Sequence, residues 1–170
     1  MALFGLALAQ ARLRNLDPAR SMAERGLAIC REIGDRFFVS YFLWILALVE
    51  TDAGDVEAAG RYAAEALEVA EELEVPLLLV SALEASARVA RACGDDARAV
   101  ALLTRADDIG RSGMVPLSYV ATVVRELGDL ARSRGDEAAA RALFDRSLSI
   151  ARSVGDDWGE RRTLELTSGA

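Results

Sequence analysis

Pairs of acidic residues are the first feature of this sequence that suggests chemistry, because two carboxylates can act as general acid and base or bind a hard cation. Adjacent acidic pairs include Glu71-Glu72, Asp95-Asp96, Asp107-Asp108 and Asp156-Asp157. Neighbouring residues of a helix point about 100° apart, so the two carboxylates of a pair do not converge on one ligand. Three of the pairs also stand at or near predicted helix ends, where Asp is a common cap. We therefore interpret all four as solvated surface and helix caps.

The other residue types that carry catalysis are scarce. The chain has no His, which removes the commonest general base and the commonest metal ligand together. Its two cysteines, Cys30 and Cys93, lie far apart in predicted helices, and we expect both to be small buried residues in a reducing compartment. No phosphate-binding or dinucleotide-binding glycine motif is present. The sequence thus predicts a protein that is not an enzyme and has no catalytic, cofactor-binding or metal-binding residues.

Length and composition exclude several other classes of protein. The chain has 170 residues, 52% of them hydrophobic, which is enough for one globular domain or a short repeat array. A net charge of −7 argues against a nucleic-acid-binding surface, which is normally basic. The most apolar stretch, residues 37–49, is shorter than the roughly 18 residues that cross a membrane, and the apolar start lacks the charged segment of a signal peptide. We expect a cytoplasmic protein with no membrane contact.

Turn signals recur along the chain with a fixed interval. Asn15, Asp55, Asp95 and Asp136 follow one another at intervals of 40, 40 and 41 residues, and Gly precedes the last three. Positions counted from these turns are all small or all apolar in five aligned columns. Those columns are Leu3, Leu43, Leu83, Val124; Ala7, Ala47, Ala87, Gly128; Ala19, Ala59, Ala99, Ala140; Ala23, Ala63, Leu103, Phe144; and Gly26, Ala66, Ala106, Ser147. Five such columns indicate a true internal repeat.

Each repeat is predicted to be a pair of helices. A Gly ends one helix in the left-handed conformation, and the following Asp caps the next. A second set of breaks, which includes Pro76 and Pro116, separates one helix pair from the next, and Pro suits the first turn of a helix. The predicted helices span residues 2–13, 17–33, 36–53, 56–74, 76–93, 96–112, 116–134, 137–154 and 157–167. Small columns mark close contacts between helix backbones, and large apolar columns fill the space between them.

These residues resemble the tetratricopeptide repeat family. The fourth unit matches its pattern best, through Leu127-Gly128, Gly135-Asp136, Ala140, Phe144 and Ser147-Leu148. The repeat is longer than the family's usual period of about 34 residues, and Gln10, Glu50, Ala90 and Ala131 occupy the position of its Tyr. In this respect the chain is similar to the sensor regions of large bacterial signal-transduction ATPases and to peptide-sensing regulators.

The resemblance implies an all-α fold, a right-handed α-solenoid of about four antiparallel helix hairpins with a C-terminal capping helix. We expect one domain over residues 1–170, with repeats at about 1–34, 35–75, 76–114 and 115–155 and a cap at 156–168. In the cap, Trp158 and Leu164 are expected to pack on the 137–154 helix. The first helix has hardly any polar residues before Gln10, which favours cover by a preceding repeat or by a second copy of the chain.

In such a solenoid the first helices of the hairpins line a concave binding face. The repeat register places twelve residues there: Phe4, Leu8, Ala11; Trp44, Leu48, Thr51; Glu84, Arg88, Arg91; Arg125, Asp129, Arg132. The first half is apolar, and the second half carries four arginines with two acids. Arginine binds carboxylate or phosphate through two hydrogen bonds. The candidate binding residues are Trp44, Leu48, Glu84, Arg88, Arg91, Arg125, Asp129 and Arg132.

Three interpretations of this face remain open. The face binds a ligand, its charges pair within the chain (Glu84 with Arg88, Arg125 with Asp129, or with acids of the neighbouring hairpin), or it is covered by missing sequence or self-association. The leading functional hypothesis is a module of a bacterial regulator that binds a protein or peptide, one with an apolar end and an acidic group. The alternatives are a receptor domain for a small molecule or signalling peptide, and a structural homodimerisation element.

Overall fold

The computed structural model describes residues 2–168, which form nine helices and no strand within that range. The helices are α1 (Ala2–Arg12), α2 (Leu16–Ile33), α3 (Arg36–Ala53), α4 (Val56–Leu73), α5 (Pro76–Ala92), α6 (Asp96–Gly110), α7 (Leu117–Ser133), α8 (Glu137–Val154) and α9 (Asp157–Ser168). Every boundary lies within two residues of the prediction. The chain divides into two compact units, residues 1–99 and 100–170, and α6 crosses the division.

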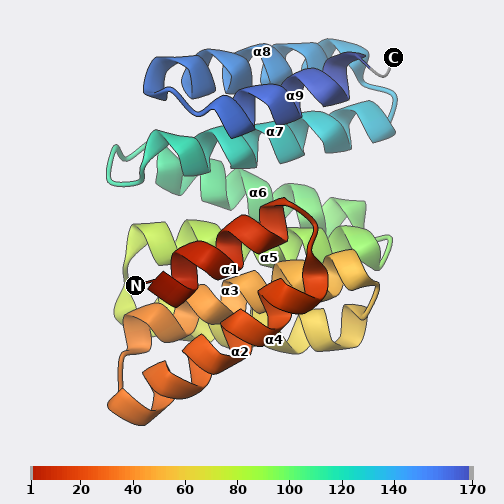
Figure 1. The fold of residues 1–170 in the computed structure, drawn as a ribbon. Coiled ribbons are helices and arrows are strands. Elements are labelled where there is room, and N and C mark those ends of the chain that lie inside the picture. The colour runs from red at the N-terminus through yellow and green to blue at the C-terminus, as the bar shows by residue number, and fades with distance from the viewer. Residues whose placement is uncertain (1, 169–170) are drawn as a thin grey trace. The chain divides into compact units, whose positions relative to one another are not determined.

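The first unit consists of two layers of helices. Helices α1, α3 and α5 lie side by side in one layer, and α2 and α4 pack against it (Figure 1). We call α1, α3 and α5 the first-helix layer of this unit, because each opens a hairpin. Helix α3 contacts the other four helices and is buried continuously from Val39 to Ala47. Its long apolar stretch is therefore the core of the unit.

The second unit is built around the pair α7 and α8. Helix α9 packs on both of them, most extensively on α8. The end of α6 approaches α7 closely, because a Cβ built on Gly110 would lie 2.9 Å from Cγ2 of Val120. A bidentate ion pair between Asp107 of α6 and Arg146 of α8, with both N···O distances 2.8 Å, holds this end of α6 in place.

The turns confirm the predicted helix stops and caps. Side chains of Asp35, Asp55, Asp95, Asp136 and Asp156 each accept a hydrogen bond from the backbone N–H three residues later. Gly54 has the left-handed conformation expected at a helix end, with φ of 87°. At two junctions Arg14 (φ 60°) and Glu74 (φ 53°) adopt this conformation, although they carry side chains that disfavour it.

The repeat columns lie in the core as predicted. All their members are buried except Leu3, which is half-buried. The helices approach each other most closely at Gly26 of α2, where a Cβ would lie only 2.2 Å from the ring of Phe42 on α3. At Gly128 of α7 a Cβ would lie 2.9 Å from the ring of Phe144 on α8. Glycine at these positions lets an aromatic ring of the adjacent helix contact the backbone.

The position that is Tyr in the tetratricopeptide pattern holds a charged residue in the second repeat. In the second repeat it is Glu50, a buried residue of α3, and Arg20 of α2 donates two hydrogen bonds to its carboxylate at 2.6 and 2.9 Å. The hydrogen bonds to Glu50 raise the pKa of Arg20 above its ordinary value, against the opposing effect of burial. At this position a partly buried ion pair joins α2 to α3, where the tetratricopeptide pattern has a Tyr.

One expectation about the cysteines is wrong. Cys30 is buried as predicted, but Cys93 is exposed, because it caps the C-terminus of α5 and lies beyond the packed part of that helix. Within residues 2–168, no helix combines the length and apolar character needed to cross a bilayer.

We predict that Gly26→Ala destabilises the protein by about 1–3 kcal/mol, because the new methyl group overlaps the Phe42 ring. Gly60→Ala in α4 is the matched control, since its Cβ would meet only Val89 at 3.8 Å. Replacing a helical glycine there should be neutral or stabilise by up to about 1 kcal/mol. Urea unfolding followed by circular dichroism measures both, and equal stabilities of the two variants would contradict the close α2–α3 contact.

Candidate functional site

The predicted binding residues lie on three first helices. Trp44 and Leu48 are on α3, and Glu84, Arg88 and Arg91 are on α5, all in the first unit. Arg125, Asp129 and Arg132 are on α7 in the second unit.

In the first unit, Trp44 and Glu84 are joined directly. They occupy the same position in successive repeats, and Nε1 of Trp44 donates a hydrogen bond to Oε2 of Glu84 at 2.8 Å. Both side chains are buried, with 6% and 4% of their surface exposed. A buried carboxylate needs such donors, because it has lost its hydration.

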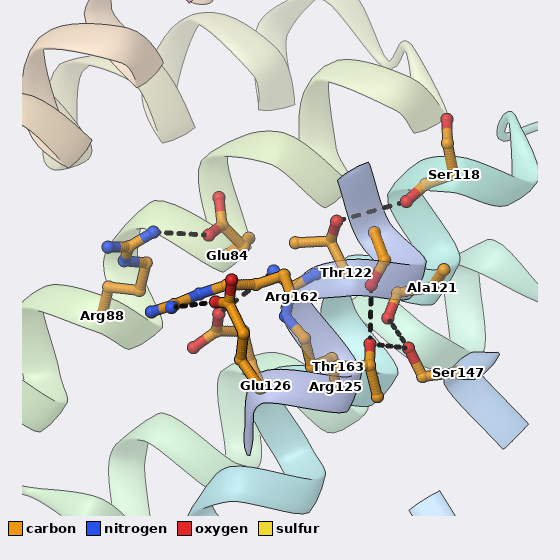
Figure 2. A network of polar contacts seen from close by, with 12 residues as sticks. Glu84, Arg88, Ser118, Ala121, Thr122, Arg125, Glu126, Ser147, Arg162 and Thr163 are labelled. Carbon is orange, nitrogen blue, oxygen red and sulfur yellow. Dashed lines mark hydrogen bonds and ion pairs between the residues drawn. The ribbon is translucent and has the colours of Figure 1, made fainter. Parts of the chain in front are cut away.

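Arg88 extends this pair into a network of charges. Its guanidinium lies 3.7 Å from Oε1 of Glu84 one turn earlier, and Figure 2 shows these two side chains. Arg88 also donates a hydrogen bond to Oδ1 of Asp52 on α3 at 2.9 Å, and Arg14 approaches Oδ2 of Asp52 at 3.3 Å. Both pairings proposed for Arg88, with Glu84 and with an acid of the neighbouring hairpin, are therefore present. We call Trp44, Glu84, Arg88 and Asp52 the α3–α5 network.

Sequence reasoning missed Asp52 and Arg14. Asp52 directly follows Thr51, which the repeat register placed on the concave face. Including the sequence neighbours of the register positions would therefore have identified Asp52. Thr51 is half-buried, and its hydroxyl donates to the Ala47 carbonyl at 2.7 Å within α3. Leu48 is also half-buried, as is Arg91.

Phe4 of α1 packs against α3 within the unit. The ring of Phe4 lies 4.8 Å from that of Tyr41 and contacts Phe38 and Phe42, all on α3. Tyr41 in turn contacts Trp44 edge-on at 6.1 Å. An aromatic cluster therefore supports the indole of Trp44 and fixes the direction of its N–H toward Glu84.

In the second unit, the α7 arginines contact α8 and α9. Arg125, only 3% exposed, lies 5.2 Å above the Trp158 ring and 3.5 Å from Glu126. Arg132 donates to Oδ1 of Asp129 at 2.7 Å and to the backbone carbonyl of Leu166, and it lies 5.6 Å from the Phe144 ring. These contacts join α7 to α9 and α8.

A small buried polar cluster completes the α7–α8–α9 contact (Figure 2). The Ser147 hydroxyl donates to the Ala121 carbonyl at 2.8 Å and lies 3.3 Å from the Thr163 hydroxyl, which donates to the Gly159 carbonyl. Thr163 is fully buried, whereas Leu164, the residue expected to pack on α8, is exposed. Helix α9 therefore packs through Gly159 and Thr163 rather than through Leu164.

The interpretation of Asp107 as a solvated residue is wrong. Asp107 is buried and accepts hydrogen bonds from Arg146 and Arg111. Burial raises the pKa of its carboxyl, but the two guanidinium groups outweigh burial and hold that pKa below its ordinary value. Its neighbour Asp108 is exposed as expected. Among residues 2–168, no three His, Cys, Asp or Glu side chains are grouped to hold a metal ion.

No known family model matches the chain, and no curated protein matches it. Solved structures do match. A Rap protein complexed with Competence and Sporulation Factor superimposes with a TM-score of 0.79 and 20% identity, covering 95% of this chain and 44% of that one. The apo form of RapI gives a TM-score of 0.71 and 17% identity over 91% of this chain and 56% of that one.

A third match is a signal transduction ATPase with numerous domains (STAND) that has a tetratricopeptide repeat sensor, from Pyrococcus horikoshii. Its TM-score is 0.73 at 17% identity, covering 95% of this chain and 24% of that one. The chain therefore spans about half or less of the length of these proteins. At these identities the likeness concerns the fold. The predicted all-α fold of tetratricopeptide-type helix hairpins is confirmed.

The Asp107 site predicts a pH-dependent stability. A folded-state pKa below the unfolded value of about 3.9 stabilises the fold above that pH, and the contribution is lost as pH falls through the folded-state pKa. Asp107→Asn should lower the free energy of unfolding by about 1–3 kcal/mol at pH 7, and this deficit should narrow below about pH 4. Asp108→Asn is the exposed control. A deficit that is independent of pH, or an equal one in the control, would contradict the ion pair.

Proposed function

We propose that the chain is a protein- or peptide-binding module. It binds through the sides of α3, α5 and α7 that carry the predicted binding residues, which we call the first-helix face of each unit. The observation that carries this proposal is the α3–α5 network, in which aromatic, acidic and basic side chains meet on two neighbouring first helices. Arg88 keeps 28% of its side chain exposed, so an incoming carboxylate can reach it. The half-buried Leu48 and Thr51 lie on the adjacent turns of α3.

Binding proceeds by exchange of ion-pair partners. A ligand carboxylate replaces Asp52 as an acceptor of Arg88, and Asp52 keeps its contact with Arg14. Arg91 on α5 and, in the second unit, Arg125, Asp129 and Arg132 belong to the proposed binding residues. A small acidic molecule or a signalling peptide would use the same chemistry, which makes a receptor domain the alternative form of this proposal.

The role in the cell follows from the same proposal. Two of the matching structures are a Rap protein with a bound factor and a STAND protein with a repeat sensor, and these likenesses support a sensing or scaffolding part. We assign the chain to a bacterial regulator, acting in the cytoplasm and without enzymatic activity of its own. Occupation of the first-helix face would be transmitted through the stacked hairpins.

The test uses two arginines with the same local pairing. Arg88 lies four residues after Glu84 on α5, and Arg61 lies four residues after Glu57 on α4. Peptides selected from a random library against the intact chain are titrated against Arg88→Glu and Arg61→Glu by fluorescence anisotropy. We expect Arg88→Glu to weaken binding at least tenfold and Arg61→Glu to leave it unchanged. If both variants bind equally, or no peptide binds the folded chain, the proposal fails.

A second candidate function, homodimerisation, is favoured by one observation on α1. Leu6 is 51% exposed, whereas the equivalent residue one repeat later, Leu46, is fully buried. Ala9 is likewise exposed and its equivalent Val49 buried. A second copy of the chain, packed through the same face of its own α1, would remove this apolar surface from water.

Analytical ultracentrifugation at several concentrations tests the dimer hypothesis. The chain should sediment at twice its monomer mass at high concentration, and Leu6→Glu should sediment as a monomer. Leu117→Glu, at an exposed leucine on α7, is the control and should remain dimeric. A wild-type chain that stays monomeric at every concentration would exclude this function.

A further inference from the structure

A pocket of about 320 Å³ opens in the first unit where the ends of α2 and α4 meet the start of α3. This volume is at the lower end for ligand sites, so it fits one long side chain rather than a large cofactor. None of the predicted binding residues lines it, and its lining does not include the α3–α5 network.

One side of the pocket is apolar and neutral. Cys30, Val39 and Val69 line it, and all three are at least nine-tenths buried. The Cys30 thiol has no hydrogen-bond partner among the described residues. Burial, with the nearby Asp35 carboxylate, raises its pKa, so the thiol stays protonated at neutral pH. This part of the pocket suits the methylene stem of a long side chain.

The charged side of the pocket has one unbalanced carboxylate. Two ion pairs flank the pocket, Arg31 with Glu65 at 2.5 Å and Arg36 with Glu72. Glu68 lies between Glu65 and Glu72 on the lining face of α4, and it is exposed with no ion pair to any described residue. Three carboxylates therefore face two guanidinium groups, and the surplus charge is negative.

The ends of two helices add to the negative electrostatic potential of the pocket. Cys30, Arg31 and Gly34 come from the last turn and cap of α2, and Val69 and Glu72 from the last turns of α4. The C-terminal end of a helix carries a partial negative charge. The start of α3 carries the opposite partial charge, but the Asp35 carboxylate caps it. The two C-terminal ends and Glu68 together therefore favour a cation in the pocket.

We propose that this pocket binds an arginine side chain of a partner protein, with the guanidinium on Glu68 and the stem against Val39 and Val69. Arginine fits better than lysine because its planar fork pairs with a carboxylate through two hydrogen bonds. This site is a second docking point, and it does not depend on the proposed use of the first-helix face.

The test titrates the full chain with N-acetyl-arginine methylamide and follows backbone amides by ¹⁵N–¹H NMR. We expect the amides of Gly34, Val39 and Val69 to shift. The neutral isostere N-acetyl-citrulline methylamide should leave them unmoved. Glu68→Gln should raise the dissociation constant at least fivefold. Glu24→Gln, an exposed glutamate of α2 outside the pocket, removes the same charge and should bind as the wild type does.

Three outcomes would overturn the proposal: equal shifts with citrulline, equal affinities of the two glutamine variants, or tighter binding of the corresponding lysine amide. Arg88→Glu separates this site from the proposed function. That variant should lose peptide binding at the first-helix face and keep the arginine titration unchanged.

Discussion

The close contact of helix backbones at small residues is the constraint on which the rest of the structure depends. Ala19, Ala59 and Ala140 are essentially without exposed surface, and Gly26 has the ring of Phe42 where a side chain would be. Helices can approach this closely only if every repeat keeps the same register, because a shift of one residue would replace a small contact by a large one. The interval of 40 or 41 residues between turns is therefore a packing requirement.

This register also decides how polar side chains of successive repeats meet. Trp44 and Glu84 are forty residues apart and meet because first helices of adjacent hairpins lie side by side. Within the second unit, Asp107 and Arg146 are thirty-nine residues apart and link second helices in the same manner. Desolvation offsets much of the attraction within a buried ion pair, but removing one partner leaves the other charge buried and uncompensated.

The sequence was sufficient to predict the helices, their caps and the buried columns, because these depend on local signals repeated four times. It did not reveal the burial of Asp107, since the partner that allows it, Arg146, follows a whole repeat later and no local pattern marks the pair. Arg125 shows the same limit. The repeat register predicted its position on α7, but its contact with Trp158 depends on how α9 packs against α7. Local periodicity identifies which face a residue occupies, and tertiary contacts decide its partner.

The pairing within the α3–α5 network does not oppose binding at Arg88, because its acidic partners in that network, Glu84 and Asp52, differ. Glu84 is buried and accepts the indole N–H of Trp44, so removing Arg88 from it would leave a buried charge with less compensation. Asp52 is more exposed and has a second cation in Arg14. A ligand carboxylate therefore displaces Asp52 at low cost, while Glu84 holds the guanidinium in place. An arginine oriented by the buried Glu84 and shared with the more accessible Asp52 is thereby preorganised for an incoming anion.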